Sequence, residues 1–292
     1  MKIVLLGKNG QLGREFQRTL SALGETILLG REELDVSSLG SVSTILNNLK
    51  PSLIINASAY TQVDLAEKEI DNALKINALA PGVMAETARK IGSILIHYST
   101  DYVFDGKKNI PYIESDPTNP LNMYGKSKLA GEENVKQAGE AYLILRTSWV
   151  YSTHGDNFVH KVLEWARKNK MLKIASDQIS NPTWARDLAD VTNRILSQNQ
   201  VNLYDVIHEK RGLYHLAASG YTSRYEWAKQ ILANDPNRTE QLVRSMEPVS
   251  SERFPTPALR PLFTALDCAK FEKTFRIKMP AWRTSLQKAL ME

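Results

Sequence analysis

Short apolar runs alternate with longer helical stretches through the first 150 residues of the chain. An apolar run of about four to eight residues predicts a buried strand, and strands that alternate with helices predict βαβ units. Parallel strands joined in this way need helices on both faces of the sheet, because their crossovers are right-handed. The first half therefore predicts an α/β fold with a doubly wound parallel sheet. The expected strands are Lys2–Leu6, Thr26–Leu29, Leu53–Asn56, Ile94–Tyr98 and Leu143–Ser148, and the expected helices are Gln11–Leu23, Ser38–Leu49, Val63–Ile91 (interrupted near Pro81) and Tyr124–Gln137.

The alternation loosens after about residue 151. Three prolines between residues 251 and 261 forbid a long helix there, so this stretch predicts an ordered loop. The expected strands of the second half are Leu172–Ser176 and Gly212–Ala217, and the expected helices are Trp184–Leu196, Ser223–Ala233 and Trp282–Leu290. We expect residues 1–150 to form one domain and residues 151–292 a smaller mixed part, with residues of about 172–198 returning to the sheet.

Composition excludes several classes of protein. Hydrophobic residues make up 42% and charged residues 24% of the chain, which is typical of a globular protein. Cys268 is the only cysteine, so an internal disulfide and a CxxC zinc site are excluded, and the histidines show no metal-ligand spacing. The N-terminal apolar run is too short for a signal peptide or a membrane span. We therefore expect a cytoplasmic protein that binds neither a membrane nor a metal ion.

The basic excess behind the net charge of +5 lies after residue 150. No run of five or more Lys or Arg occurs, and the basic residues interleave with acidic ones. This pattern argues against nucleic-acid binding. A small phosphorylated ligand explains the excess equally well.

Three glycines follow the first strand and open the first helix, in the sequence GKNGQLG of residues 7–13. Glycine there permits a tight turn and close approach of the backbone to a pyrophosphate, while the helix N-terminus offers free N–H groups to the anion. The spacing is GxxGxxG rather than GxGxxG, and such glycines can also be ordinary turn residues. Their place between a strand and a helix favours a dinucleotide site at Gly7, Gly10 and Gly13, which makes residues 1–150 a dinucleotide-binding domain.

The end of the second strand is where an acidic residue is expected to bind the ribose 2′-hydroxyl of a dinucleotide. Gly30 and Arg31 stand there instead, so a 2′-phosphate is tolerated and can pair with the guanidinium. NADPH is therefore the expected cofactor, with NADH as the alternative because Glu32 and Glu33 follow at once. Asp35 lies where the chain can pass an adenine ring, or where a helix N-cap region is equally expected.

Tyr124 and Lys128 are one turn apart in an expected helix and project from the same face. A nearby ammonium favours phenolate, so Lys128 is expected to lower the pKa of Tyr124. A YxxxK pair alone is more typical of an exposed helix surface than of a proton-transfer site. Thr100, however, ends an apolar strand where ligands of open α/β sheets bind, and Ser99 beside it is an alternative hydroxyl. Together these residues predict a site that gives a proton to a carbonyl oxygen.

These features resemble the extended short-chain dehydrogenase/reductase family, whose pattern combines GxxGxxG with a Ser/Thr–Tyr–Lys triad. The similarity is narrower to the nucleotide-sugar reductases of that family and runs through nearly the whole chain. The segments that carry it are NASAYTQVD (56–64), YSTDYVF (98–104), PLNMYGKSK (120–128), RTSWVY (146–151) and PTPALRP (255–261). The resemblance implies a Rossmann-like fold and the last step of dTDP-rhamnose biosynthesis, in which NADPH or NADH reduces the 4-keto group of dTDP-4-dehydro-β-L-rhamnose to give dTDP-L-rhamnose.

The resemblance also implies roles for individual residues. Tyr124 is the proton donor, Lys128 holds the nicotinamide ribose and biases Tyr124, and Thr100 polarises the ketone. The residues implied to contact the rest of the cofactor are Gly10, Gln11, Leu12, Asp35, Val36, Ala59, Tyr60, Thr61 and Tyr98. Those implied to contact the dTDP-sugar substrate are Thr100, Asp101, Tyr124 and Trp149. Arg260 is expected either to clamp the substrate diphosphate or to anchor its own loop.

Two other functions stay open at this point. One is a nucleotide-sugar epimerase or dehydratase of the same fold, which keeps its NAD bound and oxidised. The other is a non-catalytic, dinucleotide-binding regulatory subunit, against which the complete Thr100, Tyr124 and Lys128 set argues. Some relatives dimerise through an acidic, magnesium-binding C-terminal region, but the tail here offers little beyond Glu292. A monomer and a homodimer are therefore both compatible with the sequence.

Overall fold

The strands expected in the first half lie side by side in one sheet, which a strand from the second half completes. In the computed structural model, which describes residues 1–292, the sheet has six strands in the order β10-β5-β4-β3-β1-β2, and every neighbouring pair is parallel. These strands are β1 (Lys2–Leu6), β2 (Glu25–Leu29), β3 (Leu53–Asn56), β4 (Ile94–Thr100), β5 (Tyr142–Thr147) and β10 (Gly212–His215). The predicted α/β fold with a doubly wound parallel sheet is confirmed.

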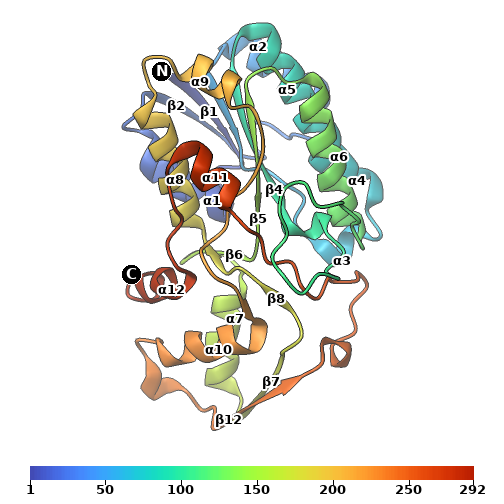
Figure 1. Cartoon of the computed structure of the whole chain (residues 1–292), viewed down its shortest axis with the longest axis vertical. Coiled ribbons are helices and arrows are strands. Elements are labelled where there is room, and N and C mark those ends of the chain that lie inside the picture. Colours follow the sequence, from blue (N-terminus) through green and yellow to red (C-terminus); the bar gives the residue numbers. More distant parts are fainter.

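Helices cover both faces of this sheet (Figure 1), with α2, α5 and α6 on one face and α1, α8 and α11 on the other. The longer helices are α1 (Gln11–Leu20), α2 (Leu39–Leu49), α5 (Ala80–Ile91), α6 (Met123–Ala138), α7 (Phe158–Lys168), α8 (Ala185–Gln198), α10 (Arg224–Ala233) and α12 (Trp282–Leu290). The shorter ones are α3 (Val63–Ala66), α4 (Ile70–Leu74), α9 (Leu203–Glu209) and α11 (Ala269–Phe275), with 3₁₀ turns at Asp101–Val103, Arg238–Glu240 and Ser251–Arg253.

The two faces of the sheet bury alternate residues of each strand, because successive strand side chains point in opposite directions. Ile3 and Leu5 of β1 pack with Phe16 of α1 in one core, whereas Val4 packs with Val42 of α2 in the other. All five side chains are completely buried. Burial on both faces explains why the strands of the first half appear in the sequence as continuous apolar runs.

Much of the second half forms a smaller part, which lies below the sheet in Figure 1 and has its own core around Trp227 and Trp282. Here β7 (Met171–Ala175) pairs with β12 (Ser245–Val249) rather than with the central sheet. We predicted that residues 172–198 return to the central sheet, and for β7, the strand of this segment, that prediction is wrong. Only alternate residues of β7 are buried, which suits a surface pair and not a strand covered on both faces. The following helix, α8, does pack on α1 beside the sheet. The remaining short strands are β6 (Val150–Tyr151), β8 (Ile179–Ser180), β9 (Thr183–Trp184) and β11 (Thr222–Ser223).

The helix expected over residues 63–91 is interrupted twice before its proline. α3 ends at Ala66, α4 begins at Ile70, and a π-helical segment, Lys75–Leu79, joins α4 to α5. Pro81 is the second residue of α5, directly after the π-helical segment, and its nitrogen has no hydrogen to donate to the preceding turn. The irregular segment thus lies directly before the proline, and π-helical segments are frequent at functional sites.

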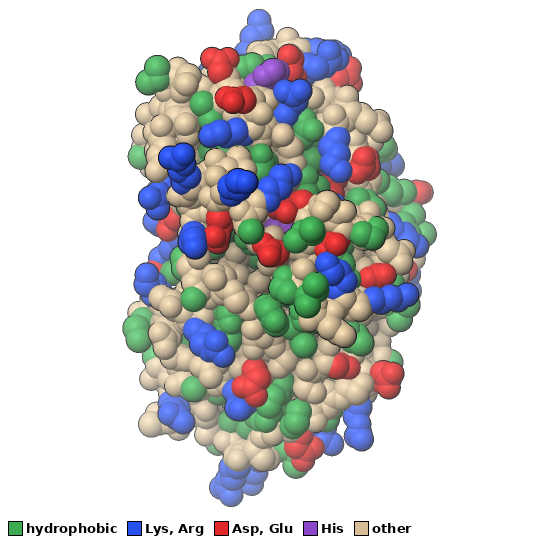
Figure 2. All heavy atoms as spheres, in the orientation of Figure 1, with side chains coloured by type: hydrophobic (Ala, Val, Ile, Leu, Met, Phe, Trp, Pro, Cys, Tyr) green, Lys and Arg blue, Asp and Glu red, His purple; other side chains and the backbone are tan.

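The surface carries charges of both signs. On the face drawn in Figure 2, Lys and Arg side chains are interspersed with Asp and Glu, and apolar side chains gather near its centre. None of the helices combines the length and the apolar character that crossing a bilayer requires. The His, Cys, Asp and Glu side chains form no group of three or more that could hold a metal ion.

Candidate active site

Thr100 ends β4 in the interior of the sheet, and its side chain is buried. Its hydroxyl accepts a hydrogen bond from the backbone N–H of Tyr102 and donates one to Oδ1 of Asp101, both at 3.2 Å. The hydroxyl is therefore held in place at the carboxyl end of the strand, the edge at which open α/β sheets bind ligands.

The start of α6 is fixed against this strand end. Oδ1 of Asn122 caps the helix by accepting a hydrogen bond from the N–H of Gly125 at 2.8 Å, and Nδ2 donates to the carbonyl of Leu259 at 2.7 Å. A Cβ atom on Gly125 would lie 2.3 Å from the carbonyl oxygen of Tyr102, so only glycine permits this close approach. The cap and the glycine together place Tyr124 beside the end of β4.

Tyr124 contacts Thr100, and its surroundings set the protonation state of its phenol. Burial raises the pKa of Tyr124, while the contact with the Thr100 hydroxyl acts in the opposite direction. The ring of Tyr102 meets that of Tyr124 edge to face, with 5.9 Å between the centroids. The prediction that Lys128 lowers the pKa of Tyr124 is wrong for this structure, because burial dominates. A phenol with a raised pKa stays protonated at neutral pH, which is the form that can donate a proton.

Lys128 is directed at the backbone of β4. Its side chain is 2% exposed, and its ammonium donates a hydrogen bond to the carbonyl of Tyr98 at 2.6 Å. Burial lowers the pKa of Lys128 to about 8, and the Glu132 carboxylate opposes that change. The Tyr98 phenol points away towards α8, where it lies 2.6 Å from the Thr192 hydroxyl. The carbonyl of Tyr98 therefore faces the site, whereas its side chain packs in the core.

A buried ion pair lies one helical turn beyond Lys128. Glu132 accepts two hydrogen bonds from Arg146 of β5, at 2.8 and 2.6 Å, and a third from the Ser99 hydroxyl at 2.6 Å. Ser99 is thus engaged on the side of α6, and Thr100 is the hydroxyl that meets Tyr124. Sequence reasoning missed this pair, although a charged residue inside the apolar strand 142–147 was a signal for it.

Asp101 is a buried carboxyl beside Thr100. It is 2% exposed, and its Oδ2 accepts hydrogen bonds from Thr264 at 2.5 Å and from Ser180 at 3.1 Å. Burial nevertheless raises the pKa of Asp101 to about 6. Both hydroxyl donors come from the second half of the chain, so Asp101 joins the end of β4 to the smaller part.

The glycine turn leaves the start of α1 without a cap. Gly7 has a φ angle of +84°, and a Cβ atom on Gly13 would lie 2.0 Å from the carbonyl oxygen of Gly7. Gly10 precedes α1 with no side-chain cap, and the first turn carries no acidic residue. The free N–H groups at Gln11 and Leu12, together with the positive end of the helix dipole, can therefore take an anion. This part of the chain fits the pyrophosphate of a dinucleotide.

The residues predicted near the adenosine lie between β2 and α2. Arg31 is 85% exposed and lies 3.9 Å from the Asp35 carboxylate. That carboxylate accepts hydrogen bonds from the N–H and the hydroxyl of Ser37, at 2.9 and 2.8 Å, and so closes a turn. Val36 packs against the core beneath α2. Asp35 thus has a structural role in the unliganded chain, which was the alternative its sequence position allowed.

The loop after β3 carries Ala59, Tyr60 and Thr61, and Asn77 of the π-helical segment holds it. The side-chain oxygen of Asn77 accepts from the N–H of Tyr60 at 2.9 Å, while its Nδ2 donates to the Tyr60 carbonyl and to the Ser127 hydroxyl, both at 3.0 Å. Asn77 therefore ties the predicted cofactor loop to the residue that precedes Lys128. Sequence reasoning missed Asn77, whose only signal was an amide inside an apolar helical run.

Trp149 has a φ angle of +40°, which is uncommon for a bulky residue. The guanidinium of Arg224 lies over its ring, 3.8 Å from the centroid, and 4.7 Å from the centroid of Phe158. Burial lowers the pKa of Arg224, and the nearby Asp101 acts in the opposite direction. Arg224 stacks on aromatic rings and forms no ion pair, so it is a cation available to an anionic ligand. The sequence pointed to cations of the second half but did not single it out.

Arg260 is already paired in the structure. Its guanidinium donates to both carboxylate oxygens of Asp64, at 2.9 and 2.7 Å, and also to the Thr256 hydroxyl and the Ala258 carbonyl. These contacts fasten the proline-rich loop to α3. Of the two roles expected for Arg260, the anchor of its own loop is the one that these contacts perform.

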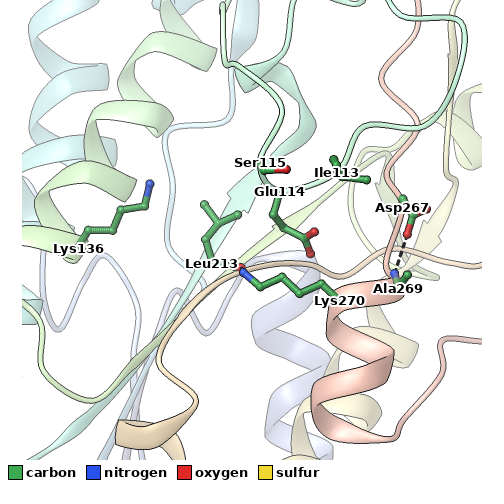
Figure 3. Close-up of a pocket in the computed structure, with 8 residues that line it drawn as sticks. All are labelled: Ile113, Glu114, Ser115, Lys136, Leu213, Asp267, Ala269 and Lys270. Carbon is green, nitrogen blue, oxygen red and sulfur yellow. Dashed lines mark hydrogen bonds between the residues drawn. The ribbon is translucent and has the colours of Figure 1, made fainter.

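A cavity of about 500 Å³ lies away from these residues, beside β10 and α11 (Figure 3). Glu114 accepts a hydrogen bond from the N–H of His215 at 2.8 Å, and Lys270 donates one to the Leu213 carbonyl at 2.7 Å. These side chains satisfy the open edge of β10, which would otherwise offer a pairing surface. The cavity is lined by Ile113, Glu114, Ser115, Lys136, Leu213, Asp267, Ala269 and Lys270, none of which was predicted to be functional.

Comparison with known proteins agrees with this arrangement. Residues 1–292 match the family described as RmlD substrate binding domain. The chain is 38% identical to a dTDP-4-dehydrorhamnose reductase of Burkholderia thailandensis, over 97% of this chain and 96% of that protein. A reductase of the same name from Clostridium acetobutylicum superposes with a TM-score of 0.90 at 35% identity, over 100% of this chain and 99% of that one. The Bacillus anthracis reductase, solved in complex with NADP, gives 0.88 at 32% identity, over 99% and 98%. The chain therefore belongs to the RmlD family, the family of the dTDP-4-dehydrorhamnose reductases.

Proposed function

We propose that this protein reduces the 4-keto group of dTDP-4-dehydro-β-L-rhamnose to give dTDP-L-rhamnose, the last step of dTDP-rhamnose biosynthesis, with NADPH or NADH. The observation that carries the proposal is the packing of the start of α6 on the end of β4, where the Asn122 cap and the close approach of Gly125 to Tyr102 place Tyr124 beside Thr100, with Lys128 buried one helical turn away. The names of the relatives support the choice of sugar, and the NADP in the Bacillus anthracis reductase supports the choice of cofactor.

Residues of this chain supply and position the proton that the ketone oxygen takes up during the reduction. A bound nicotinamide cofactor supplies the hydride to C4 of the sugar. Tyr124 donates its phenolic proton to the ketone oxygen, and Thr100 holds that oxygen with its hydroxyl. Lys128 then stabilises the phenolate that Tyr124 becomes. General acid catalysis of this kind contributes about 10²–10⁴-fold to the rate, and fixed orientation of the reactants contributes further.

Arg224 and Trp149 are the residues we assign to the sugar nucleotide, together with Asp101. Arg224 forms no ion pair in the structure and stacks on aromatic rings, so its guanidinium can bind the diphosphate. Arg260 takes part indirectly, since its bonds to Asp64 hold the loop next to the Asn122 cap of α6.

The test is to mix the purified protein with dTDP-4-dehydrorhamnose and either NADPH or NADH, to follow the loss of absorbance of the reduced cofactor, and to identify the sugar formed. We expect oxidation of the cofactor and dTDP-L-rhamnose as the product. Protein that purifies with bound NAD⁺ and gives no net oxidation would instead identify an epimerase or dehydratase. Cofactor binding without turnover of any nucleotide sugar would identify a regulatory subunit.

We further propose that the protein acts in the cytoplasm, as a monomer or a homodimer, and without nucleic acid. The interleaving of basic and acidic residues along the chain, without a run of five or more Lys or Arg, supports the absence of a nucleic-acid partner. Light scattering of the purified protein gives the oligomeric state, and a tetramer or a filament would contradict the proposal.

A further inference from the structure

Lys8 and Glu33 form a charged pair at the end of β2, of which the sequence pointed only to Glu33, as a residue that favours NADH. Proteins of this fold read the ribose 2′ position of the adenosine at the end of the second strand, through an acid for NAD or a cation for NADP. Gly30 stands at that point and has no side chain for either task. The question is therefore which side chains replace it.

Glu33 brings a carboxylate back to Gly30 from three residues further along the chain. Its Oε2 accepts a hydrogen bond from the backbone N–H of Gly30 at 2.8 Å, and its Oε1 accepts one from the Lys8 ammonium at 2.5 Å. A Cβ atom built on Gly30 would lie 3.0 Å from Cε of Lys8 and 3.2 Å from Oε2 of Glu33. Nδ2 of Asn9 lies 3.0 Å from the same position. These three side chains surround the space that a side chain at position 30 would enter, and the two charged ones, Lys8 and Glu33, are called the Lys8–Glu33 pair below.

Lys8 connects this pair to the glycine turn of residues 7–13. Lys8 is the second residue of the glycine turn, and the N–H groups of both Gly7 and Lys8 point at the carbonyl of Leu29, the last residue of β2, at 2.9 and 3.3 Å. The side chains of Lys8 and Glu33 are 25% and 39% exposed, so a ligand can reach both charges. Arg31 lacks such fixed contacts, because it is 85% exposed and lies 3.9 Å from its nearest carboxylate.

We propose that the Lys8–Glu33 pair selects between NADH and NADPH. Glu33 accepts a hydrogen bond from the ribose 2′-hydroxyl of NADH and repels the 2′-phosphate of NADPH. Lys8 attracts that phosphate, and it must exchange its bond to Glu33 for one to the phosphate when NADPH binds. The pair therefore lets one chain accept both cofactors, with a preference set by the balance of its two charges. This inference rests on the proposed use of a nicotinamide dinucleotide.

The test measures binding rather than turnover. Dissociation constants of NADPH and NADH are determined by calorimetry for the wild-type protein and for Glu33→Gln, Lys8→Met and Glu32→Gln. Glu32→Gln is the matched control, because it removes the same charge from the adjacent exposed residue, which takes no part in the contacts to Gly30 or Lys8. Competition by 2′,5′-ADP and by 5′-ADP repeats the comparison with probes that lack the nicotinamide.

We expect Glu33→Gln to shift the affinity ratio towards NADPH by about two- to fivefold, as for loss of one exposed charge at contact distance. We expect Lys8→Met to shift it towards NADH by at least as much, because a charge-assisted bond to phosphate is lost. Glu32→Gln should leave the ratio within about twofold. Equal shifts in Glu33→Gln and Glu32→Gln, or no shift in Glu33→Gln, would overturn the inference.

The outcomes separate this inference from the proposed function. A protein that binds both dinucleotides with the expected variant shifts, yet reduces no sugar, keeps the inference and loses the proposed activity. A protein that reduces the sugar but shows no variant shift keeps the activity and loses the inference. A protein that binds neither dinucleotide contradicts both.

Discussion

At the scale of single residues, the environment decides what each group of the site can do. Tyr124 and Lys128 were expected to form a pair in which the ammonium makes the phenol more acidic. In the folded chain burial acts on both and favours the neutral form of each, so the pKa of Tyr124 rises and that of Lys128 falls to about 8. A neutral phenol is the form that a reductase needs at the start of its reaction.

Replacing Tyr124 by phenylalanine removes this proton and leaves the ring in place. We expect Tyr124→Phe to lower kcat by about 10²–10⁴-fold, the contribution of a general acid, with the dissociation constant of NADPH unchanged. Steady-state kinetics and calorimetry measure the two quantities. Tyr225→Phe is the matched control, because it loses a hydroxyl that bonds only to the Met246 carbonyl in the smaller part. A Tyr124→Phe variant with the wild-type kcat would remove Tyr124 from the proton-transfer step.

Asp101 makes the stability of the protein depend on pH. Its pKa is about 6 in the folded chain, above the usual 3.8, so between these values the folded state binds more protons than the unfolded state. The free energy of unfolding should therefore fall as pH rises through this range, by about 3 kcal/mol for a shift of about two units. Urea unfolding from pH 4 to 7 measures this slope, and Asp101→Asn should flatten it. Identical slopes in the two proteins would show that Asp101 titrates normally.

At the scale of elements, glycines decide how closely α6 approaches its neighbours. A Cβ atom on Gly131 would lie 2.0 Å from the carbonyl oxygen of Asn77 in the π-helical segment, just as one on Gly125 would meet Tyr102. The Tyr124–Lys128 face is positioned by these backbone contacts. Apolar packing alone would not position this face so closely, because most buried residues of α6 are polar or glycine.

Gly131→Ala tests this close approach. We expect it to destabilise the protein by about 1–3 kcal/mol or more, because backbone atoms must move to admit the methyl group. Gly40→Ala is the control, since a Cβ atom on Gly40 of α2 meets nothing within 4 Å, and there alanine should add about 0.5 kcal/mol. Thermal unfolding of both variants gives the comparison. The same effect in both would mean that helix propensity, and not packing, governs α6.

At the scale of the whole molecule, the two halves share one sheet. β10 comes from residues 212–215 yet pairs with β5, and α8 and α11 complete the core on the α1 face. The smaller part returns hydroxyl donors, Ser180 and Thr264, to Asp101 at the end of β4. The site is therefore built from both halves and depends on their joint folding.

This shared sheet predicts a single unfolding transition. All five tryptophans lie at or after position 149, so their fluorescence reports mainly on the second half, whereas far-UV circular dichroism reports on all helices. We expect the two signals to follow the same curve in urea, because the core on the α1 face is built from residues of both halves. Two separated transitions would show that residues 1–150 fold independently.

The sequence by itself determined the doubly wound sheet and the glycine turn, and it predicted Thr100, Tyr124 and Lys128 as the residues of the site. These depend on local patterns, namely apolar runs buried on both faces and glycines that the turn requires. Only the tertiary structure decided the pKa direction of Tyr124, the pairing of Arg260 with Asp64, the placement of β7 outside the sheet and the contacts made by Asn77 and Arg224. Those outcomes depend on which groups from distant parts of the chain come into contact and on how far burial removes them from water. The spacing of residues along the sequence contains neither kind of information.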